Sequence, residues 1–276
     1  MNSTPATATL SPTAKLPVSA VFITLNAAHQ LEEALRSVQA CDDIVVVDSG
    51  STDGTPELAA RYGARVFQQP WMGFGPQKQH AVEQAKHDWV LCLDADERVT
   101  PALQAQLLSL FNAGPANLPT TLAGFEMPRC NWFLGRPLRH GEGYPDYSKR
   151  LFHRQRARWS NDTVHEKVEC NPGLHFQRIP GDLEHRSADS LESYLTKQNR
   201  YTSLQAQALA ARGKWPSTAK LVLSPLLRFI KFYGVRGGFL DGWQGFVHIT
   251  IGCFNSFVKY AKAREAIRKS WDSRDC

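Results

Sequence analysis

Two aspartates one residue apart, Asp94 and Asp96, follow a continuous apolar run in Trp-Val-Leu-Cys-Leu-Asp-Ala-Asp-Glu. The apolar run predicts a strand that is covered on both faces, and residues two apart on an extended chain point to the same side. A hard divalent cation prefers oxygen ligands and fills the rest of its shell with water and phosphate oxygens. The pair therefore predicts a Mg²⁺ or Mn²⁺ site that bridges a diphosphate and neutralises charge on a leaving nucleotide.

Polar side chains also follow two earlier apolar runs. Thr24 and Asn26 end the first run, and Asp48 follows Ile-Val-Val-Val and precedes a segment rich in Ser and Gly. In an open parallel sheet, ligands bind outside the carboxyl ends of the strands, so these residues and the aspartate pair should share one edge. A carboxylate at Asp48 can accept a hydrogen bond from the N3–H of uracil, which favours uridine nucleotides. The alternative is that Asp48 only caps a turn.

Strands and the helices between them must position these side chains. Residues 18–112 alternate short β-branched runs with patterns of helical period, which is typical of βαβ units and a parallel sheet. The predicted strands cover residues 18–25, 43–47, 64–68 and 89–93. From about residue 122 to 185, aromatic- and Arg-rich strand candidates alternate with Gly, Pro and Asn, so this half is expected to be antiparallel or irregular.

Helical patterns dominate the remainder of the chain. Asp189 and Glu192 form a capping-box pattern, and the helix that they open is expected to end near Gly213. An α/β domain over residues 18–188 is therefore expected to lie between a disordered arm and a basic helical extension. The expected arm, the two halves of the α/β domain and the extension cover residues 1–17, 18–112, 113–188 and 189–276.

Basic residues are concentrated in the C-terminal third. The net charge is +6, and residues 189–276 carry 14 Lys and Arg against 6 Asp and Glu, which leaves 18 against 20 for the rest. The apolar stretch 246–260 is shorter than the ~20 residues that a spanning helix needs. With the stretch 221–233 and the cations after it, this segment is typical of a helix that lies on an anionic membrane surface. The alternative is a core helix with a solvated basic end. The cations are Lys259, Lys262, Arg264, Arg268 and Lys269.

Other features indicate a cytoplasmic protein that does not bind nucleic acid. The six cysteines contain no C-x-x-C pair, which predicts a reducing compartment and no zinc site. The first 17 residues have neither an apolar run nor a basic start, unlike a signal peptide. No aromatic-basic RNA motif or helix-turn-helix pattern stands out.

The segment Val-Val-Val-Asp-Ser-Gly-Ser-Thr-Asp-Gly-Thr, followed by Leu-Cys-Leu-Asp-Ala-Asp-Glu, resembles glycosyltransferase family 2, the inverting sugar transferases of GT-A fold. The fold implied is α/β, a Rossmann-like, mostly parallel sheet flanked by helices, here with a helical C-terminal extension. Later motifs resemble the lipopolysaccharide core β-1,4-glucosyltransferases, which add glucose to inner-core heptose. These motifs are Arg-Leu-Phe-His-Arg (150–154), Val-His-Glu (164–166), Leu-Glu-His (183–185) and Gly-Gly-Phe-Leu-Asp-Gly-Trp-Gln-Gly (237–245).

The resemblance implies that residues 18–112 form the nucleotide-sugar half and residues 113–188 the acceptor half. It also implies roles for residues on the donor side. Asp96 would be the principal metal ligand, and Asp94 would face the ribose or the donor sugar. The remaining donor residues would contact the nucleoside or support the donor pocket. The nucleoside contacts would be Thr24, Asn26 and Asp48, and the supporting residues would be Asp53 and Lys78.

Inversion needs a single carboxylate that deprotonates the acceptor hydroxyl as it attacks the anomeric carbon. Glu166 is the predicted base, because it lies in the half where the fold builds the acceptor side and because the resemblance places a base there. Asp146 and Asp162 are alternative bases. The alternative for Glu166 itself is a structural role, as a surface carboxylate paired with Lys167 or Arg158. His165 could contact the diphosphate or the acceptor, or could only orient its neighbour.

Three further residues could contact phosphate. Arg150 and Arg154 could clamp the diphosphate or a phosphorylated acceptor, since the guanidinium geometry suits phosphate, although a solvated strand face is an equal alternative. His185 could be a further metal or phosphate contact or a satisfied structural histidine.

The predicted function is transfer of a sugar, glucose from UDP-glucose, to a lipid-linked saccharide such as inner-core heptose. The enzyme would act as a peripheral protein on the cytoplasmic face of the inner membrane. A transferase for another envelope glycan, namely capsule, O-antigen or glycolipid, is the main alternative. A nucleotidyltransferase lacks support, because Asn-Ala-Ala-His-Gln stands where a Gly-rich loop should follow the first strand. A non-catalytic membrane-binding module is the remaining hypothesis.

Overall fold

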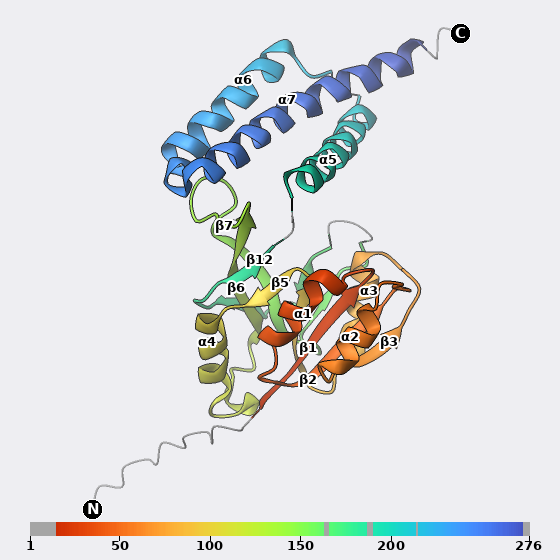
Figure 1. Cartoon of the computed structure of the whole chain (residues 1–276), viewed down its shortest axis with the longest axis vertical. Coiled ribbons are helices and arrows are strands. Elements are labelled where there is room, and N and C mark those ends of the chain that lie inside the picture. Colours follow the sequence, from red (N-terminus) through yellow and green to blue (C-terminus); the bar gives the residue numbers. More distant parts are fainter. Residues whose placement is uncertain (1–14, 163–165, 187–189, 214, 273–276) are drawn as a thin grey trace, which may run out of the picture. The chain divides into compact units, whose positions relative to one another are not determined.

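The computed structural model describes residues 15–162, 166–186, 190–213 and 215–272 (Figure 1). The chain divides into two compact units, and each contains two separate stretches of sequence. The first unit consists of Met1–Arg129 and Asp146–His185, and the second of Cys130–Pro145 and Arg186–Cys276. The segment 130–145, which lies inside the predicted acceptor half, therefore belongs with the C-terminal helices.

Four parallel strands lie next to one another in the first unit, within the predicted nucleotide-sugar half. The order is β3-β2-β1-β4, and each neighbouring pair runs parallel. The strands lie within a few residues of their predicted positions, so the predicted α/β class is confirmed. Their bounds are β1 (Leu16–Thr24), β2 (Cys41–Asp48), β3 (Arg65–Gln68) and β4 (Trp89–Asp94).

The sheet continues beyond β4 with mixed directions. The strand β8 runs antiparallel to both β4 and β6, β5 pairs antiparallel with β12, and β11 runs parallel to β6. A separate antiparallel ribbon is formed by β9 and β10. The bounds are β5 (Glu97–Val99), β6 (Leu122–Phe133), β7 (Arg136–Pro137), β8 (Asp146–His153), β9 (Ala157–Trp159), β10 (Val168–Cys170), β11 (His175–Arg178) and β12 (Leu183–His185).

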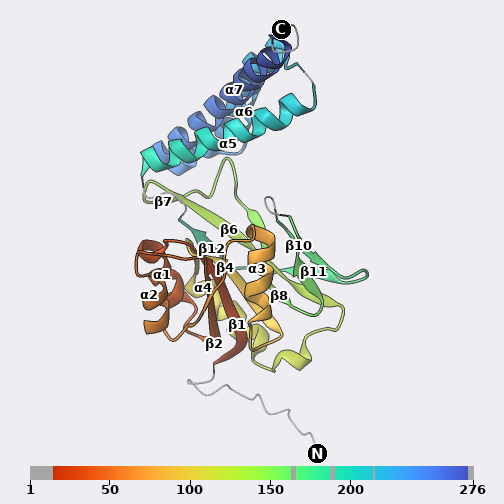
Figure 2. The ribbon, with the colours of Figure 1, turned by 90° about the vertical axis from the view of Figure 1, so that its right-hand side faces the viewer.

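Helices cover both faces of this sheet, as Figure 2 shows. Side chains alternate along β1, so that Phe22 enters the apolar core shared with α1, α2 and α4, whereas Val21 enters the core shared with α3 and the β9–β10 ribbon. Thr100 caps α4 by accepting a hydrogen bond from Leu103 N–H, and Pro101 occupies its first position. The bounds are α1 (Ala28–Ser37), α2 (Thr55–Arg61), α3 (Phe74–Glu83), α4 (Pro101–Phe111) and the 3₁₀ turn η1 (Pro115–Asn117).

Three long helices build the second unit, where α7 contacts both α5 and α6. The capping box of α5 is formed by Ser190 and Ser193, while Asp189 lies outside the described residues. Within the described part of the chain, no helix is long and apolar enough to cross a membrane. The bounds are α5 (Leu191–Ala211), α6 (Thr218–Phe229), the π-helical η2 (Ile230–Val235), η3 (Gly238–Asp241) and α7 (Gly242–Asp272).

The Gly-rich motif at 237–245 holds the second unit together. The buried Asp241 carboxylate accepts hydrogen bonds from the backbone N–H groups of Arg139 and His140 and lies 2.8 Å from His140 Nδ1. A Cβ on Gly238 would fall 2.7 Å from the backbone oxygen of Phe232, so only glycine permits this approach. The motif therefore fixes the segment 130–145 onto the helices.

Candidate active site

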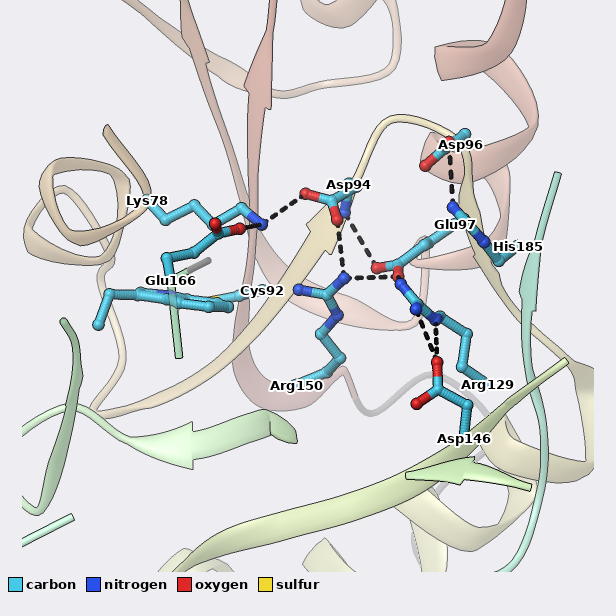
Figure 3. Close-up of polar contacts among 11 residues, drawn as sticks. Lys78, Cys92, Asp94, Asp96, Glu97, Arg129, Asp146, Arg150, Glu166 and His185 are labelled. Atoms are coloured by element: carbon cyan, nitrogen blue, oxygen red, sulfur yellow. Dashed lines mark hydrogen bonds and ion pairs between the residues drawn. The ribbon is translucent and has the colours of Figure 1, made fainter. Parts of the chain in front are cut away.

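Charged side chains from both halves of the first unit meet at the carboxyl end of β4 (Figure 3). Asp94 ends that strand, Lys78 comes from α3, and Arg150 comes from β8. Glu166 belongs to the segment that leads into β10. The predicted donor and acceptor halves thus contribute side chains to one cluster.

Asp94 is held by two cations, one on each oxygen. Its Oδ1 lies 2.9 Å from Lys78 Nζ, and its Oδ2 lies 2.7 Å from Arg150 Nη2. Burial raises the pKa of this carboxyl, but the neighbouring Arg150 and Lys78 outweigh that effect and hold the pKa well below its ordinary value. Asp94 is consequently a fixed anion that orients two cations.

Asp96 points away from Asp94, toward β12. Residues 95 and 96 form a turn between β4 and β5, so the alternation of an extended chain ends at Asp94. Asp96 Oδ2 lies 3.3 Å from His185 Nε2, and both side chains are largely buried. The two aspartates therefore have different partners in this arrangement, and their shared metal role stays a prediction.

Among the described residues, no three His, Cys, Asp or Glu side chains gather into a metal-binding group. The pair of Asp96 and His185 nevertheless fits a cation that takes most of its ligands from elsewhere. Mg²⁺ in phosphate-transfer sites commonly uses one or two carboxylates, with substrate phosphates and waters completing the shell. One carboxylate oxygen and one imidazole nitrogen, 3.3 Å apart, form such a partial set.

Glu97, which the sequence analysis did not identify, is a completely buried carboxylate at the centre of the cluster. Its Oε1 accepts a hydrogen bond of 2.6 Å from Arg150, and its Oε2 accepts one of 3.1 Å from Asp94 N–H. Its backbone pairs with His185 in the β5–β12 ladder. The sequence feature that could have identified Glu97 is a charged residue directly after Asp-Ala-Asp, at the start of a short strand. Buried strand positions are usually apolar, so a charged residue there indicates a specific partner.

Arg129 extends the network to Asp146, the residue that follows the segment 130–145. Its guanidinium lies 3.5 Å from Glu97 Oε1 and donates to Asp146 Oδ2 through Nε and Nη2, at 3.0 and 2.6 Å. Asp146, an alternative base in the sequence analysis, is therefore committed to this ion pair.

Glu166 and Lys78 join the two halves of the site. Lys78 Nζ lies 2.8 Å from Glu166 Oε1 and 4.8 Å from the ring centroid of Trp159. Both charged side chains are largely buried, so this is not the surface pair with Lys167 or Arg158 that was the alternative. Lys167 instead pairs with Glu169 at 3.0 Å.

The two other candidates near the base are accounted for differently. Asp162 accepts a hydrogen bond from Ser160 Oγ at 2.9 Å, and its backbone oxygen accepts one from Gly75 N–H at 3.1 Å. Asp162 thus joins the loop at residues 160–162 to the start of α3. His165 lies outside the described residues.

Asp48 builds the loop that follows β2. Its carboxylate is fully buried and accepts hydrogen bonds from Thr24 Oγ1, Gly50 N–H, and both the N–H and the Oγ of Ser51, between 2.5 and 2.9 Å. Burial raises its pKa, but these hydrogen bonds, led by Ser51, outweigh burial and lower the pKa overall. In this arrangement Asp48 caps the turn. A hydrogen bond from uracil to the carboxylate would have to replace one that it already accepts, such as the bond from Ser51 Oγ.

Asn26 and Asp53 support the same loop. Asn26 adopts a positive φ of 50°, and its Oδ1 accepts a hydrogen bond from Thr52 N–H at 2.9 Å. Asp53 accepts hydrogen bonds from Ala28 N–H and from Thr55 Oγ1, at 3.0 and 2.5 Å. Both side chains therefore hold the loop against the start of α1.

The structure does not bring Arg154 to the site. Because β8 runs antiparallel to β4, Arg150 reaches the carboxyl end of β4, whereas Arg154 lies beyond β8 at the opposite end. There its Nε lies 3.1 Å from Asp88 Oδ1. Four residues of extended chain separate the two arginines by about 13 Å.

The cluster carries more negative than positive charge. Figure 3 includes five carboxylates and three cations, which give a formal charge of −2 with His185 neutral. A diphosphate would add further negative charge. A divalent cation would therefore make the site electrostatically compatible with a nucleotide diphosphate.

Comparison with known proteins identifies relatives along most of the chain. Residues 19–178 match the model of "Glycosyl transferase family 2". The lipopolysaccharide core biosynthesis glycosyltransferase LpsC of Rhizobium meliloti is 33% identical over 254 residues, which cover 90% of this chain and 92% of that protein. An uncharacterized glycosyltransferase of Rickettsia bellii is 33% identical over 258 residues, covering 90% and 86%.

Solved structures are similar at lower identity. S. aureus TarS 1–349 in complex with UDP-GlcNAc is 14% identical, with a TM-score of 0.45 and coverage of 94% of this chain and 91% of that chain. Glucosyl-3-phosphoglycerate synthase from Mycobacterium tuberculosis, in complex with Mg²⁺ and UDP, is 18% identical, with a TM-score of 0.40 and coverage of 64% and 73%. On the extent of the family match and the relatives that span nearly its whole length, this chain belongs to glycosyl transferase family 2.

Proposed function

We propose that the protein is an inverting glycosyltransferase that moves glucose from UDP-glucose to an inner-core heptose of lipopolysaccharide. The observation that carries this proposal is the buried Lys78 ammonium, which binds Asp94 of the donor half and Glu166 of the acceptor half. A single-displacement reaction needs a donor-side anchor and a base on opposite sides of one anomeric carbon. The relative LpsC, named for lipopolysaccharide core biosynthesis, supports the acceptor class.

Asp94, Lys78 and Arg150 form the donor side of the proposed mechanism. The Asp94 carboxylate fixes both cations, so their remaining N–H groups are oriented before a substrate arrives. Asp96 and His185 would hold the divalent cation. When bound, that cation would supply Lewis-acid neutralisation of the charge that develops on the diphosphate leaving group.

Glu166 would accept the proton of the attacking acceptor hydroxyl. Its ion pair with Lys78 fixes the position of the carboxylate, because the ammonium is itself held by Asp94 and lies over Trp159. Each turnover would transfer one proton to Glu166 as the bond to the sugar forms and the bond to the diphosphate breaks.

The acceptor would be lipid-linked and reached from the cytoplasmic face of the inner membrane. The basic C-terminal third and its apolar helices support this location. Another envelope glycan as the acceptor is the second candidate. Parallel assays with heptose-terminated core, O-antigen and capsule acceptors distinguish the two.

Substitution of Glu166 tests the proposal directly. Glu166→Gln should lower kcat by about 10²- to 10⁴-fold, with little change in UDP-glucose binding. Glu169→Gln is the matched control, because Glu169 is three residues away and pairs with the exposed Lys167. Transfer is measured with heptose-terminated core and Mn²⁺ or Mg²⁺. Undiminished transfer by Glu166→Gln would exclude it as the base, and failure of every nucleotide sugar to bind would overturn the donor assignment.

A further inference from the structure

Helix α6 exposes an apolar stripe that no other described element covers. Val222, Leu226 and Ile230 recur at intervals of four, and Leu223 and Leu227 run beside them. These five side chains are 49–62% exposed. Spacing of this kind places them on one side of the helix.

Helix α7 carries a second stripe of aromatic side chains. Trp243, Phe246, Phe254 and Phe257 are 41–61% exposed and fall within one narrow sector of the helix. Phe246 packs against Phe229 at the end of α6 and against Tyr233 of η2, with ring centroids 6.2 and 5.6 Å apart. The two stripes therefore adjoin, and we call them together the α6–α7 face.

Such a face is unusual on a soluble surface. Monomeric proteins rarely expose a contiguous apolar patch larger than a few hundred Å², and larger ones mark protein or membrane contacts. The second unit exposes nine large apolar side chains here, all from neighbouring helices. A binding partner for the α6–α7 face is thus expected on physical grounds.

Cations stand at the edge of this face. Lys220 lies seven residues before Leu227 on the same row of α6, Lys231 follows in the π-helical η2, and both are exposed. An apolar centre with lysines along its border is the pattern of helices that lie in a membrane interface. A second copy of the chain would bring like charge against like, since the second unit is basic.

The cations farther along α7 serve the unit's own structure. Lys262 Nζ donates hydrogen bonds to Asn199 and Thr202 of α5, and Arg264 donates to Pro216 O at 2.8 Å. These residues were expected to contact lipid in the sequence analysis. The structure instead uses them to join helices, which leaves the apolar stripes as the main candidate surface.

We propose that the α6–α7 face inserts into the interfacial layer of an anionic bilayer, with Lys220 and Lys231 at the lipid headgroups. The inference deepens the proposed function, from which it takes the lipid-linked acceptor, but it is tested without any transfer reaction. Apolar contact should provide the part of the binding that persists at high salt, and the two lysines should provide the part that salt screens.

The test is flotation of the full chain with vesicles of phosphatidylethanolamine and phosphatidylglycerol, beside vesicles of phosphatidylcholine alone. The variant Leu226→Glu/Leu227→Glu should bind at least about tenfold more weakly than the unsubstituted protein. Leu204→Glu is the matched control, because Leu204 is an equally exposed leucine on α5, on the other side of α7. Lys220→Gln and Lys231→Gln should each weaken binding about fivefold to the anionic vesicles only.

Each outcome decides the proposal. Binding retained in about 0.5 M salt and lost in the Leu226→Glu/Leu227→Glu variant supports it. Equal flotation of that variant and Leu204→Glu, or no vesicle binding at all, overturns it, and a dimer dissociated by the variant would assign the face to a second copy. Circular dichroism and UDP binding confirm folding. Vesicle binding without any sugar transfer would refute the proposed function and leave this inference standing.

Discussion

Glu97 shows how a single buried carboxylate can organise the side chains around it. One oxygen receives Arg150, the other receives the backbone N–H of Asp94, and its own backbone is paired with His185. The turn that carries Asp96 is thus fixed at both ends. We infer that Glu97 positions the donor-side residues without touching the substrate.

Glu97→Gln should separate positioning from binding. The neutral amide keeps the volume but leaves Arg150 with a weaker partner, so kcat should fall about 10- to 100-fold while the KM for UDP-glucose changes little. Folding stability should fall by about 3 kcal/mol, measured by denaturant unfolding, because a buried charge pair is broken. Glu126→Gln, which removes the carboxylate paired with the exposed Arg178, is the control. A wild-type kcat in the Glu97→Gln enzyme would exclude the positioning role.

The two arginines of the Arg-Leu-Phe-His-Arg motif should respond oppositely to the same change. Arg150→Lys removes the fork that lets one guanidinium serve Asp94 and Glu97, and transfer should fall at least about tenfold. Arg154→Lys alters an ion pair with Asp88 and a hydrogen bond to Ala85 O, both away from the site, and transfer should stay within about twofold. Steady-state kinetics measure both. Comparable losses in the two variants would contradict the placement of Arg154 away from the site.

Asp43 should make the protein sensitive to acid. Burial raises the pKa of Asp43, but hydrogen bonds from Arg65, Ser19 and Lys86 N–H outweigh burial and lower the pKa in the folded state. A carboxyl with a lowered folded pKa contributes stability above its ordinary pKa of about 3.9, and the contribution is lost as the pH falls through the folded value.

Asp43→Asn tests that contribution. The variant should be about 1–3 kcal/mol less stable at pH 7, and its stability should fall less steeply than that of the unsubstituted protein below about pH 4. Urea unfolding at several pH values measures the difference. Parallel pH profiles for the two proteins would show that Asp43 does not contribute to the acid transition.

At the scale of elements, the sequence was informative where periodicity is strong. Apolar runs located β1 to β4, and the aspartates that follow them lie at the ends of β2 and β4 as expected. Direction in the second half was not readable, because β8 and β6 pair with partners distant in sequence. Arg154 was misplaced for that reason. Ends of turns were equally hidden, so Asp96 was expected beside Asp94 instead of beside His185.

Direct backbone contacts join the start of α3 to the loop at residues 160–162. Gly75 N–H donates to Asp162 O, and a Cβ on Gly75 would lie 2.1 Å from Ser160 O. Gly75→Ala should therefore displace the loop and lower transfer at least about tenfold, with a smaller effect on UDP binding. Gly234→Ala, where nothing lies within 4 Å, is the control. Equal activity of both variants would show that the loop adapts without affecting the base.

The first unit of the molecule is built from two separate stretches of the chain that pair with each other. The chain leaves the first unit after Arg129 and returns at Asp146, and these two residues are register partners and an ion pair. The intervening segment is fixed by Asp241, about 100 residues later in the sequence. Local patterns cannot show such a contact, which is why residues 130–145 were expected in the acceptor half.

This arrangement predicts how the first unit can be isolated. Ending the chain after residue 186 while keeping residues 130–145 should cause aggregation, because the buried Phe133 and Leu138 would lose their partners in the second unit. Replacing residues 130–145 by Asn-Gly should instead join Arg129 to Asp146 through a two-residue hairpin turn, since the two are directly opposed on antiparallel strands. The shortened chain should be monomeric, unfold cooperatively and bind UDP.

Size-exclusion chromatography, thermal unfolding and UDP titration compare the two shortened chains. The hairpin-closed chain should also fail to bind anionic vesicles, because it lacks the α6–α7 face, and should lose transfer to a membrane-embedded acceptor while retaining the Lys78–Glu166 pair. If the hairpin-closed chain unfolds as readily as the simple truncation, the first unit depends on the second for its stability. The first unit is then not an independent domain that binds UDP without the unit that carries the α6–α7 face.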